Sequence, residues 1–116
     1  MTRRELIKYC LTFPDVFEDY PFDDIPDSVA AWAVMRHRLN KKSFAFIYER
    51  DGLCVNLKCK PDCAHFYRQV YTGVTPAYHM NKAHWNTVRL DNDVPLDELY
   101  AMIEQSYRLT MPKCRK

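Results

Sequence analysis

The sequence predicts an α+β two-layer sandwich, in which helices cover one face of an antiparallel sheet. Three observations support this fold class: a helix-capping motif at the start of the chain, three alternating segments separated by tight turns, and two further helical segments around another extended pair. The predicted order is helix, three strands, helix, two strands, helix. Runs of strands interrupted by helices favour an α+β fold over a parallel α/β fold.

Residues 1–116 are expected to form a single domain, because this length is enough to bury one hydrophobic core. Hydrophobic residues make up 47% of the chain, which is typical of an ordinary packed protein. No apolar run approaches the roughly 20 residues that a membrane helix needs, and the first ten residues lack the apolar segment of a secretory signal. We therefore expect a cytoplasmic monomer with no membrane partner.

The first helix is predicted to begin at Thr2, which forms a capping box with Glu5, and to end before Pro14. The acidic segment that follows is expected to be a connection with a short extended piece at residues 17–22. Aromatic rings of that piece would lie over the edge of the sheet.

Three strands are predicted at residues 31–38, 43–49 and 53–58, because apolar side chains alternate along each of them. Asp51–Gly52 is typical of a tight hairpin turn, since both residue types tolerate positive backbone angles. In the third strand the alternation places one set of side chains toward the core: Leu53, Val55 and Leu57.

The second helix is predicted to open at Pro61 and to be followed by Gly73. Helical spacing gives it one buried stripe, consisting of Cys63, Phe66, Tyr67, Val70 and Tyr71. Extended segments are expected at residues 77–80 and 85–90. A third helix then begins at Pro95 and ends at Pro112, with an inner face of Leu96, Leu99, Tyr100, Ile103 and Tyr107.

Five segments of the chain, in order, resemble one family of small bacterial proteins. They are EDYPF (18–22), SFAFIY (43–48), NLKCKP (56–61), GVTPAYHMNKAHWNTV (73–88) and SYRL (106–109). Together these segments span nearly the whole chain and resemble the MmcQ/YjbR family. The resemblance implies an α-β(3)-α-β(2)-α sandwich, similar to CyaY/frataxin or to secretion chaperones. It also implies the family's usual description as DNA-binding with a double-wing motif, but no catalytic set.

We therefore expect a non-catalytic DNA-binding protein that contacts the phosphates of double-stranded DNA through a basic strand and turn surface. Lysine and arginine supply such contacts, and their strength falls with salt. The candidate nucleic-acid-binding residues are Arg36, Arg38, Lys41, Lys42, Lys58, Lys60, Lys82 and His84. The alternative is a chaperone-like adaptor that binds another protein through aromatic side chains, which are favoured anchors at interfaces.

The segment HMNKAHWN, at residues 79–86, is expected to be a structural cluster around a polar turn. Asn81 and Asn86 would satisfy backbone groups of the turn, His79 would tie the turn to the backbone, and Trp85 would anchor the following strand to the helices.

Catalytic and metal-binding interpretations find less support in the sequence. His79 and His84 flank polar residues, and Glu18 or Asp19 could act as a base, but no known catalytic motif is present. Cys59, Cys63 and His65 lack the second ligand pair of a structural zinc site. The acidic segment at residues 15–27 is interpreted as solvated rather than iron-binding. We expect no enzyme activity, no metal and no cofactor.

Overall fold

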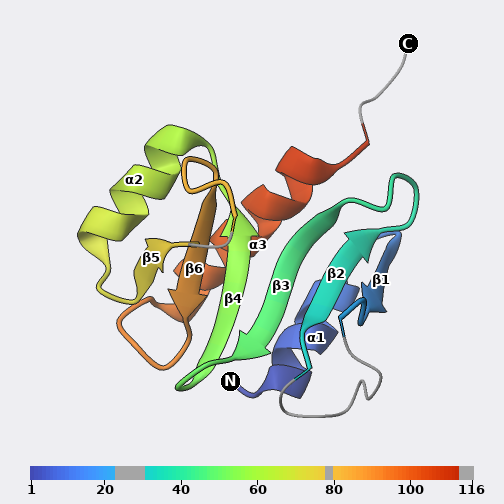
Figure 1. Ribbon diagram of the computed structural model, residues 1–116, viewed down its shortest axis with the longest axis horizontal. Coiled ribbons are helices and arrows are strands. Elements are labelled where there is room, and N and C mark those ends of the chain that lie inside the picture. The colour runs from blue at the N-terminus through green and yellow to red at the C-terminus, as the bar shows by residue number, and fades with distance from the viewer. Residues whose placement is uncertain (23–30, 78–79, 113–116) are drawn as a thin grey trace.

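The computed structural model describes residues 1–22, 31–77 and 80–112 (Figure 1). Within these ranges the elements follow one another as α1 (Arg3–Leu11), β1 (Val16–Asp19), β2 (Ala33–His37), β3 (Ser43–Glu49), β4 (Leu53–Lys58), α2 (Pro61–Val70), β5 (Val74–Pro76), β6 (Trp85–Arg89) and α3 (Leu96–Thr110). The six strands form one antiparallel sheet in the order β1-β2-β3-β4-β6-β5. The predicted α+β class is confirmed.

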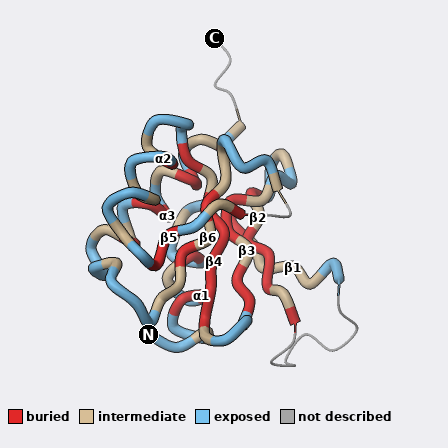
Figure 2. Tube along the Cα trace, turned by 60° about the vertical axis from the view of Figure 1, so that its left-hand side comes forward, coloured by how far each residue is buried: buried red, intermediate tan, exposed pale blue. Residues whose placement is uncertain are grey.

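The helices pack on one face of this sheet. Helices α1 and α3 lie behind the central strands in Figure 1, and α2 lies beside β5 and β6. Figure 2 shows that the buried residues concentrate in the central strands. The main cluster joins α1, α3 and the sheet through side chains that include Leu6, Ile7, Phe44, Ile47, Val55, Leu57, Val88, Met102 and Ile103.

Helix α1 begins as the capping motif predicts. The Thr2 hydroxyl accepts a hydrogen bond from the Glu5 backbone N–H at 3.2 Å, and the Glu5 carboxylate accepts one from the Thr2 N–H at 2.8 Å. These bonds satisfy two backbone donors that a helix start otherwise leaves unpaired. Because Leu6 and Cys10 face the sheet, they are fully buried.

The short extended piece expected in the acidic segment forms a fourth strand before α2. Strand β1 pairs antiparallel with β2 at the edge of the sheet, with Val16 opposite His37 and Asp19 opposite Val34. The predicted order is therefore short by one strand. The expected segment at 77–80 is also wrong in position, because β5 ends at Pro76, and residues 78 and 79 lie outside the described ranges.

A β-bulge interrupts the pairing of β2 with β3. Met35 pairs with Ala45 and Arg36 pairs with Ser43, so Phe44 has no partner in β2. Phe44 packs among Phe13, His37 and Tyr107 on the side of the helices. The extra residue therefore gives the core two consecutive side chains, Phe44 and Ala45.

The buried stripe predicted for α2 is wrong at two positions. Phe66 is 58% exposed and Val70 is 49% exposed, and Ala64 is the buried residue of this helix. Helix α2 packs against β5 and β6, at the edge of the sheet, so little of its surface is covered. Similarly, Leu96 at the start of α3 is 50% exposed, whereas Leu99, Ile103 and Tyr107 are buried as predicted.

Three buried polar side chains join α3 to the sheet. The Ser106 hydroxyl donates to the Phe44 carbonyl at 2.5 Å and accepts from the Lys58 N–H at 2.9 Å. Thr110 Oγ1 lies 2.8 Å from Nε2 of His37. Within the described ranges, no helix has the length and apolarity needed to cross a membrane.

Candidate nucleic-acid interface

The sheet brings seven of the eight predicted phosphate-binding residues to one end. The end of β2 lies beside the start of β3, since Arg36 pairs with Ser43. At the same end of the sheet, Lys58 at the end of β4 pairs with Trp85 at the start of β6. The connections at this end therefore lie together, at the top of the sheet in Figure 1. We call this region the basic end, and it carries Arg38, Lys41, Lys42, Lys58, Lys60, Lys82 and His84.

The turn between β2 and β3 is held in a defined shape. Lys41 adopts a φ of 63°, and the Lys42 N–H donates to the Asn40 side-chain oxygen at 3.0 Å. The Asn40 amide also donates to the Thr110 carbonyl at 3.0 Å, which ties the turn to the end of α3. Lys41 places its ammonium 5.1 Å from the centre of the Phe17 ring. The backbone that carries Lys41 and Lys42 is therefore held by specific hydrogen bonds.

Arg36, the eighth predicted residue, uses its side chain for contacts within the protein, to β1, to the β2–β3 turn and to the start of β3. Its Nε forms an ion pair with Asp19 at 2.8 Å, and Nη1 donates to the Lys41 carbonyl at 3.0 Å and to the Ser43 hydroxyl at 3.3 Å. Because Asp19 already neutralises this guanidinium, Arg36 contributes less to phosphate binding than the sequence suggested.

The turn before β6 is fixed by an arginine outside the predicted set. Nε of Arg68 on α2 donates to Oδ1 of Asn86 at 2.6 Å, and Nη2 donates to the carbonyls of Lys82 and Trp85. The Asn86 amide donates in turn to the Ala64 carbonyl at 3.1 Å. No local pattern around Arg68 indicates this role, because its partners lie in a distant part of the chain.

The expected structural cluster is found in part. Asn81 satisfies the turn as predicted, since its side chain accepts from the Ala83 N–H at 3.0 Å. Asn86 instead bonds to α2, and His79 lies outside the described residues. The expectation for Trp85 is wrong: it shares a face with Thr87, whereas Asn86 and Val88 point toward the helices. Alternation along β6 thus directs Trp85 away from the helix layer.

The face of the sheet opposite the helices is rich in aromatic rings. We call it the aromatic face, and the strand register and ring contacts assign to it Trp32, Val34, Phe46, Tyr48, Asn56, Trp85 and Thr87. Trp32 stacks on Tyr48 with centroids 3.9 Å apart and planes 4° apart. Phe46 meets Trp85 edge to face at 5.6 Å.

A depression of about 460 Å³ opens on the aromatic face, and it is lined by Phe22, Trp32, Phe46, Asn56 and Met80. A second depression of about 170 Å³ adjoins it, shares Trp32 and Asn56 with it, and reaches Arg50 and Arg89. Sequence reasoning missed this site. The signal that could have found it is the alternation along 43–49, in which two of the residues that face away from the core are aromatic, Phe46 and Tyr48.

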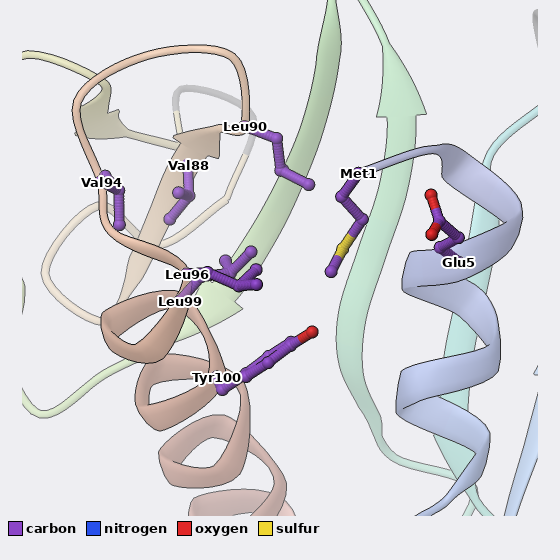
Figure 3. Close-up of a pocket in the computed structure, with 8 residues that line it drawn as sticks. All are labelled: Met1, Glu5, Val88, Leu90, Val94, Leu96, Leu99 and Tyr100. Carbon is purple, nitrogen blue, oxygen red and sulfur yellow. The ribbon is translucent and has the colours of Figure 1, made fainter.

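A third depression lies on the helix side of the sheet. It has a volume of about 420 Å³. Figure 3 shows that side chains of α3 and β6 face Met1 and Glu5 across it. The Glu5 carboxylate already accepts the Thr2 N–H in the capping box at the start of α1, and hydrogen bonding to Thr2 lowers its pKa. Since its lining is otherwise largely apolar, this depression offers little to orient a charged ligand.

Several titratable groups outside the basic end are buried or paired. Burial raises the pKa of the Cys59 thiol to about 12, so it is a poor nucleophile or metal ligand at neutral pH. Glu18 accepts a hydrogen bond of 2.6 Å from the Tyr20 hydroxyl, and Asp19 is paired with Arg36. Across the described part of the chain, no three His, Cys, Asp or Glu side chains are grouped to hold a metal ion.

A family model described as YjbR matches residues 11–109. The uncharacterized protein YjbR of Escherichia coli strain K12 is 32% identical over 109 residues, which cover 93% of this chain and 86% of that protein. The uncharacterized protein YyaQ of Bacillus subtilis strain 168 is 33% identical over 121 residues, which cover 95% of this chain and 98% of that protein.

Two solved structures share the fold. A crystal structure of a Pseudomonas syringae protein gives a TM-score of 0.80 with 33% identity, covering 96% of this chain and all (100%) of that one. The crystal structure of Deinococcus radiodurans protein DR2400 gives a TM-score of 0.79 with 33% identity, covering 93% of this chain and 77% of that one.

Proposed function

This chain belongs to the YjbR family, and we propose that it is a non-catalytic DNA-binding protein whose phosphate contacts come from the basic end of its sheet. The observation that carries this proposal is the convergence of basic side chains from three connections, at 38–42, 58–60 and 82–84, on one end of the molecule. Phosphates bound there would release counterions, so affinity would depend strongly on salt.

The described part of the acidic segment, residues 15–22, is compatible with this proposal. Strand β1 begins at the basic end, where the Asp15 carbonyl accepts the Arg38 N–H, and runs away from it, so that Asp19 lies opposite Val34. Asp19 is neutralised by Arg36, and Glu18 accepts the Tyr20 hydroxyl. The paired Asp19 carboxylate therefore repels a phosphate at the basic end less than its sequence position suggested.

The proposal is tested by fluorescence anisotropy with a labelled random-sequence duplex at about 50 mM and about 200 mM salt. A double variant, Lys41→Glu with Lys42→Glu, reverses two charges in the β2–β3 turn. The matched control, Arg4→Glu with Lys8→Glu, makes the same change in net charge on exposed positions of α1, which lies on the helix-covered side.

We expect the wild-type protein to bind more weakly at the higher salt concentration. The turn variant should lose affinity and reduce the salt slope by roughly one unit for each phosphate that it no longer binds, while the control keeps most of the slope. Absence of binding at about 50 mM salt, or an equal effect of the two double variants, would remove the basic end as a DNA interface.

A second candidate function is a protein-binding module, and the exposed side of α2 favours it. Phe66 and Val70 lie one helical turn apart and are 58% and 49% exposed. Contiguous exposed apolar surface on a protein marks candidate sites of protein–protein contact. If DNA binding fails, cross-linking of the wild-type protein and of Phe66→Ser with Val70→Ser should be compared; partners captured equally by both would exclude this surface.

A further inference from the structure

We infer that the depression on the aromatic face binds an unpaired nucleobase, so that the nucleic acid that this protein prefers is single-stranded. This inference rests on the proposed function and names its substrate class. Five side chains line the depression: Phe22, Trp32, Phe46, Asn56 and Met80. Four of them are apolar, and one is a hydrogen-bonding amide.

The rings of the depression are held in place without a ligand. Trp32 lies flat against Tyr48 at 3.9 Å and meets Phe22 at right angles at 6.3 Å. Phe46 is held edge to face against Trp85. A planar base that enters the depression would therefore meet rings that are already ordered, and little conformational entropy would be lost on binding.

Asn56 gives the depression a directed hydrogen-bond donor. Its Oδ1 already accepts from the Tyr48 hydroxyl at 2.9 Å and from the Thr87 hydroxyl at 2.7 Å. Its Nδ2 donates to the thioether sulfur of Met80 at 3.6 Å, and sulfur is a weak acceptor. The residue is only 4% exposed, so this donor is shielded from bulk water and faces the depression.

A nucleobase offers the strong hydrogen-bond acceptor that Nδ2 of Asn56 lacks. Each base carries carbonyl oxygens or ring nitrogens on its edges that accept hydrogen bonds. An oxygen or nitrogen acceptor in place of the Met80 sulfur would form a stronger hydrogen bond with Nδ2 of Asn56. Because all bases offer such an acceptor, the site should tolerate different sequences.

Charge complementarity favours a nucleic acid over an aromatic side chain of a protein. The adjoining depression is rimmed by Arg50 and Arg89, and it shares Trp32 and Asn56 with the aromatic depression. Nη1 of Arg89 donates to the backbone carbonyls of Arg50 and Asp51, at 3.0 and 2.6 Å, and these uncharged partners do not offset its charge. A strand with its base on the rings would bring its phosphates toward these arginines.

A duplex cannot use this depression without unpairing, because its bases are stacked and paired inside the helix. Binding to the basic end requires only phosphates, which both single strands and duplexes supply. The two substrate forms therefore separate the present inference from the proposed function.

The test measures anisotropy of a labelled random single strand of about 12 nucleotides and of the duplex of the same length. The informative variant is Phe22→Ala, since Phe22 is 66% exposed and its removal should leave the fold intact. The matched control is Phe66→Ala, which removes a ring that is 58% exposed on α2, outside the depression.

We expect the single strand to bind more tightly than the duplex, and Phe22→Ala to weaken single-strand binding by about tenfold, as the loss of one stacking ring predicts. Phe66→Ala should leave both affinities unchanged. Equal or tighter binding of the duplex, or an unchanged affinity in Phe22→Ala, would overturn the inference while leaving the proposed function intact. No binding of either substrate would overturn both.

Discussion

Nε of Arg68 donates a 2.6 Å hydrogen bond to Oδ1 of Asn86, and this pair joins α2 to the first residues of β6. Asn86 is 1% exposed, so its oxygen has no access to bulk water. The same arginine bonds the carbonyls of Lys82 and Trp85. One side chain thus holds the turn that carries part of the basic end.

Replacement of Arg68 by alanine should lower the free energy of unfolding by about 2–3 kcal/mol. The change leaves the buried Asn86 oxygen unpaired, and hydrogen bonds to charged groups are worth more than neutral ones. Urea unfolding measures the loss. The control is Arg108→Ala, whose exposed 3.7 Å pair with Glu104 should contribute less than about 0.5 kcal/mol. Equal losses in the two variants would contradict the anchoring role.

Replacement of Ser106 by alanine should cost about 1–3 kcal/mol of stability. Its hydroxyl is fully buried and satisfies both the Phe44 carbonyl and the Lys58 N–H, and each group would lose its partner. Ser43→Ala is the matched control, because the Ser43 hydroxyl accepts a longer bond, of 3.3 Å, from Arg36. In thermal or urea unfolding, the Ser106 variant should therefore be clearly less stable than the Ser43 control.

A methyl group at position 73 should be tolerated only if Asn92 is shortened. A Cβ on Gly73 would lie 2.8 Å from Cβ of Asn92 and 3.2 Å from Oδ1 of Asp93, which accepts the Gly73 N–H. We expect Gly73→Ala to cost about 1–3 kcal/mol, as overpacking typically does. Adding Asn92→Gly should recover part of this loss in a double-mutant cycle. Additive effects would show that the close approach is not the cause.

Stability should fall as the pH is lowered from about 7.5 to about 5, in part because of His37. Burial lowers the pKa of His37 below its ordinary 6.5, so the unfolded chain binds the proton more readily than the folded one. Where the unfolded state binds more protons, stability rises with pH, and below 6.5 it is progressively lost.

Urea unfolding at both pH values measures the free energy of unfolding. The difference between its values at the two pH values should be smaller for His37→Gln than for the wild type. His65→Gln, on the exposed side of α2, is the control and should retain the wild-type difference. The carboxylates of Glu5 and Asp93 also have lowered pKa values, but their ordinary values of 4.5 and 3.8 lie below this window. An unchanged difference in His37→Gln would exclude this source.

The sequence predicted those features of the fold that depend only on neighbouring residues. The capping box needs only residues 2–5, and the hairpin at Asp51–Gly52 has the positive φ angles, 55° and 120°, that these residue types allow. Gly73 was correctly placed in a connection, but for another reason: its close approach to Asn92 and Asp93 explains it. That approach involves residues about 20 positions away, which spacing alone does not reveal.

Features that depend on the assembled sheet could not be predicted in the same way. Helical spacing showed which side of α2 is apolar, but not that α2 lies at an edge that leaves Phe66 exposed. The role of Arg68 depends on the approach of α2 to β6, and the aromatic depression depends on side chains from separate parts of the chain. The basic end was predicted residue by residue, but its assembly follows from the strand register.

The single unpaired residue of β3 decides which side chains reach each layer. Because Phe44 bulges out of the pairing, Arg36 lies opposite Ser43, while Ala45 and Ile47 keep their partners Met35 and Ala33 and reach the core together with Phe44. Length changes in the β2–β3 turn leave this pairing intact, whereas one residue gained or lost between Ala45 and Glu49 would exchange the two faces of β3 beyond that point. Relatives with the same two surfaces should therefore vary in the turn and keep the residue count of this strand.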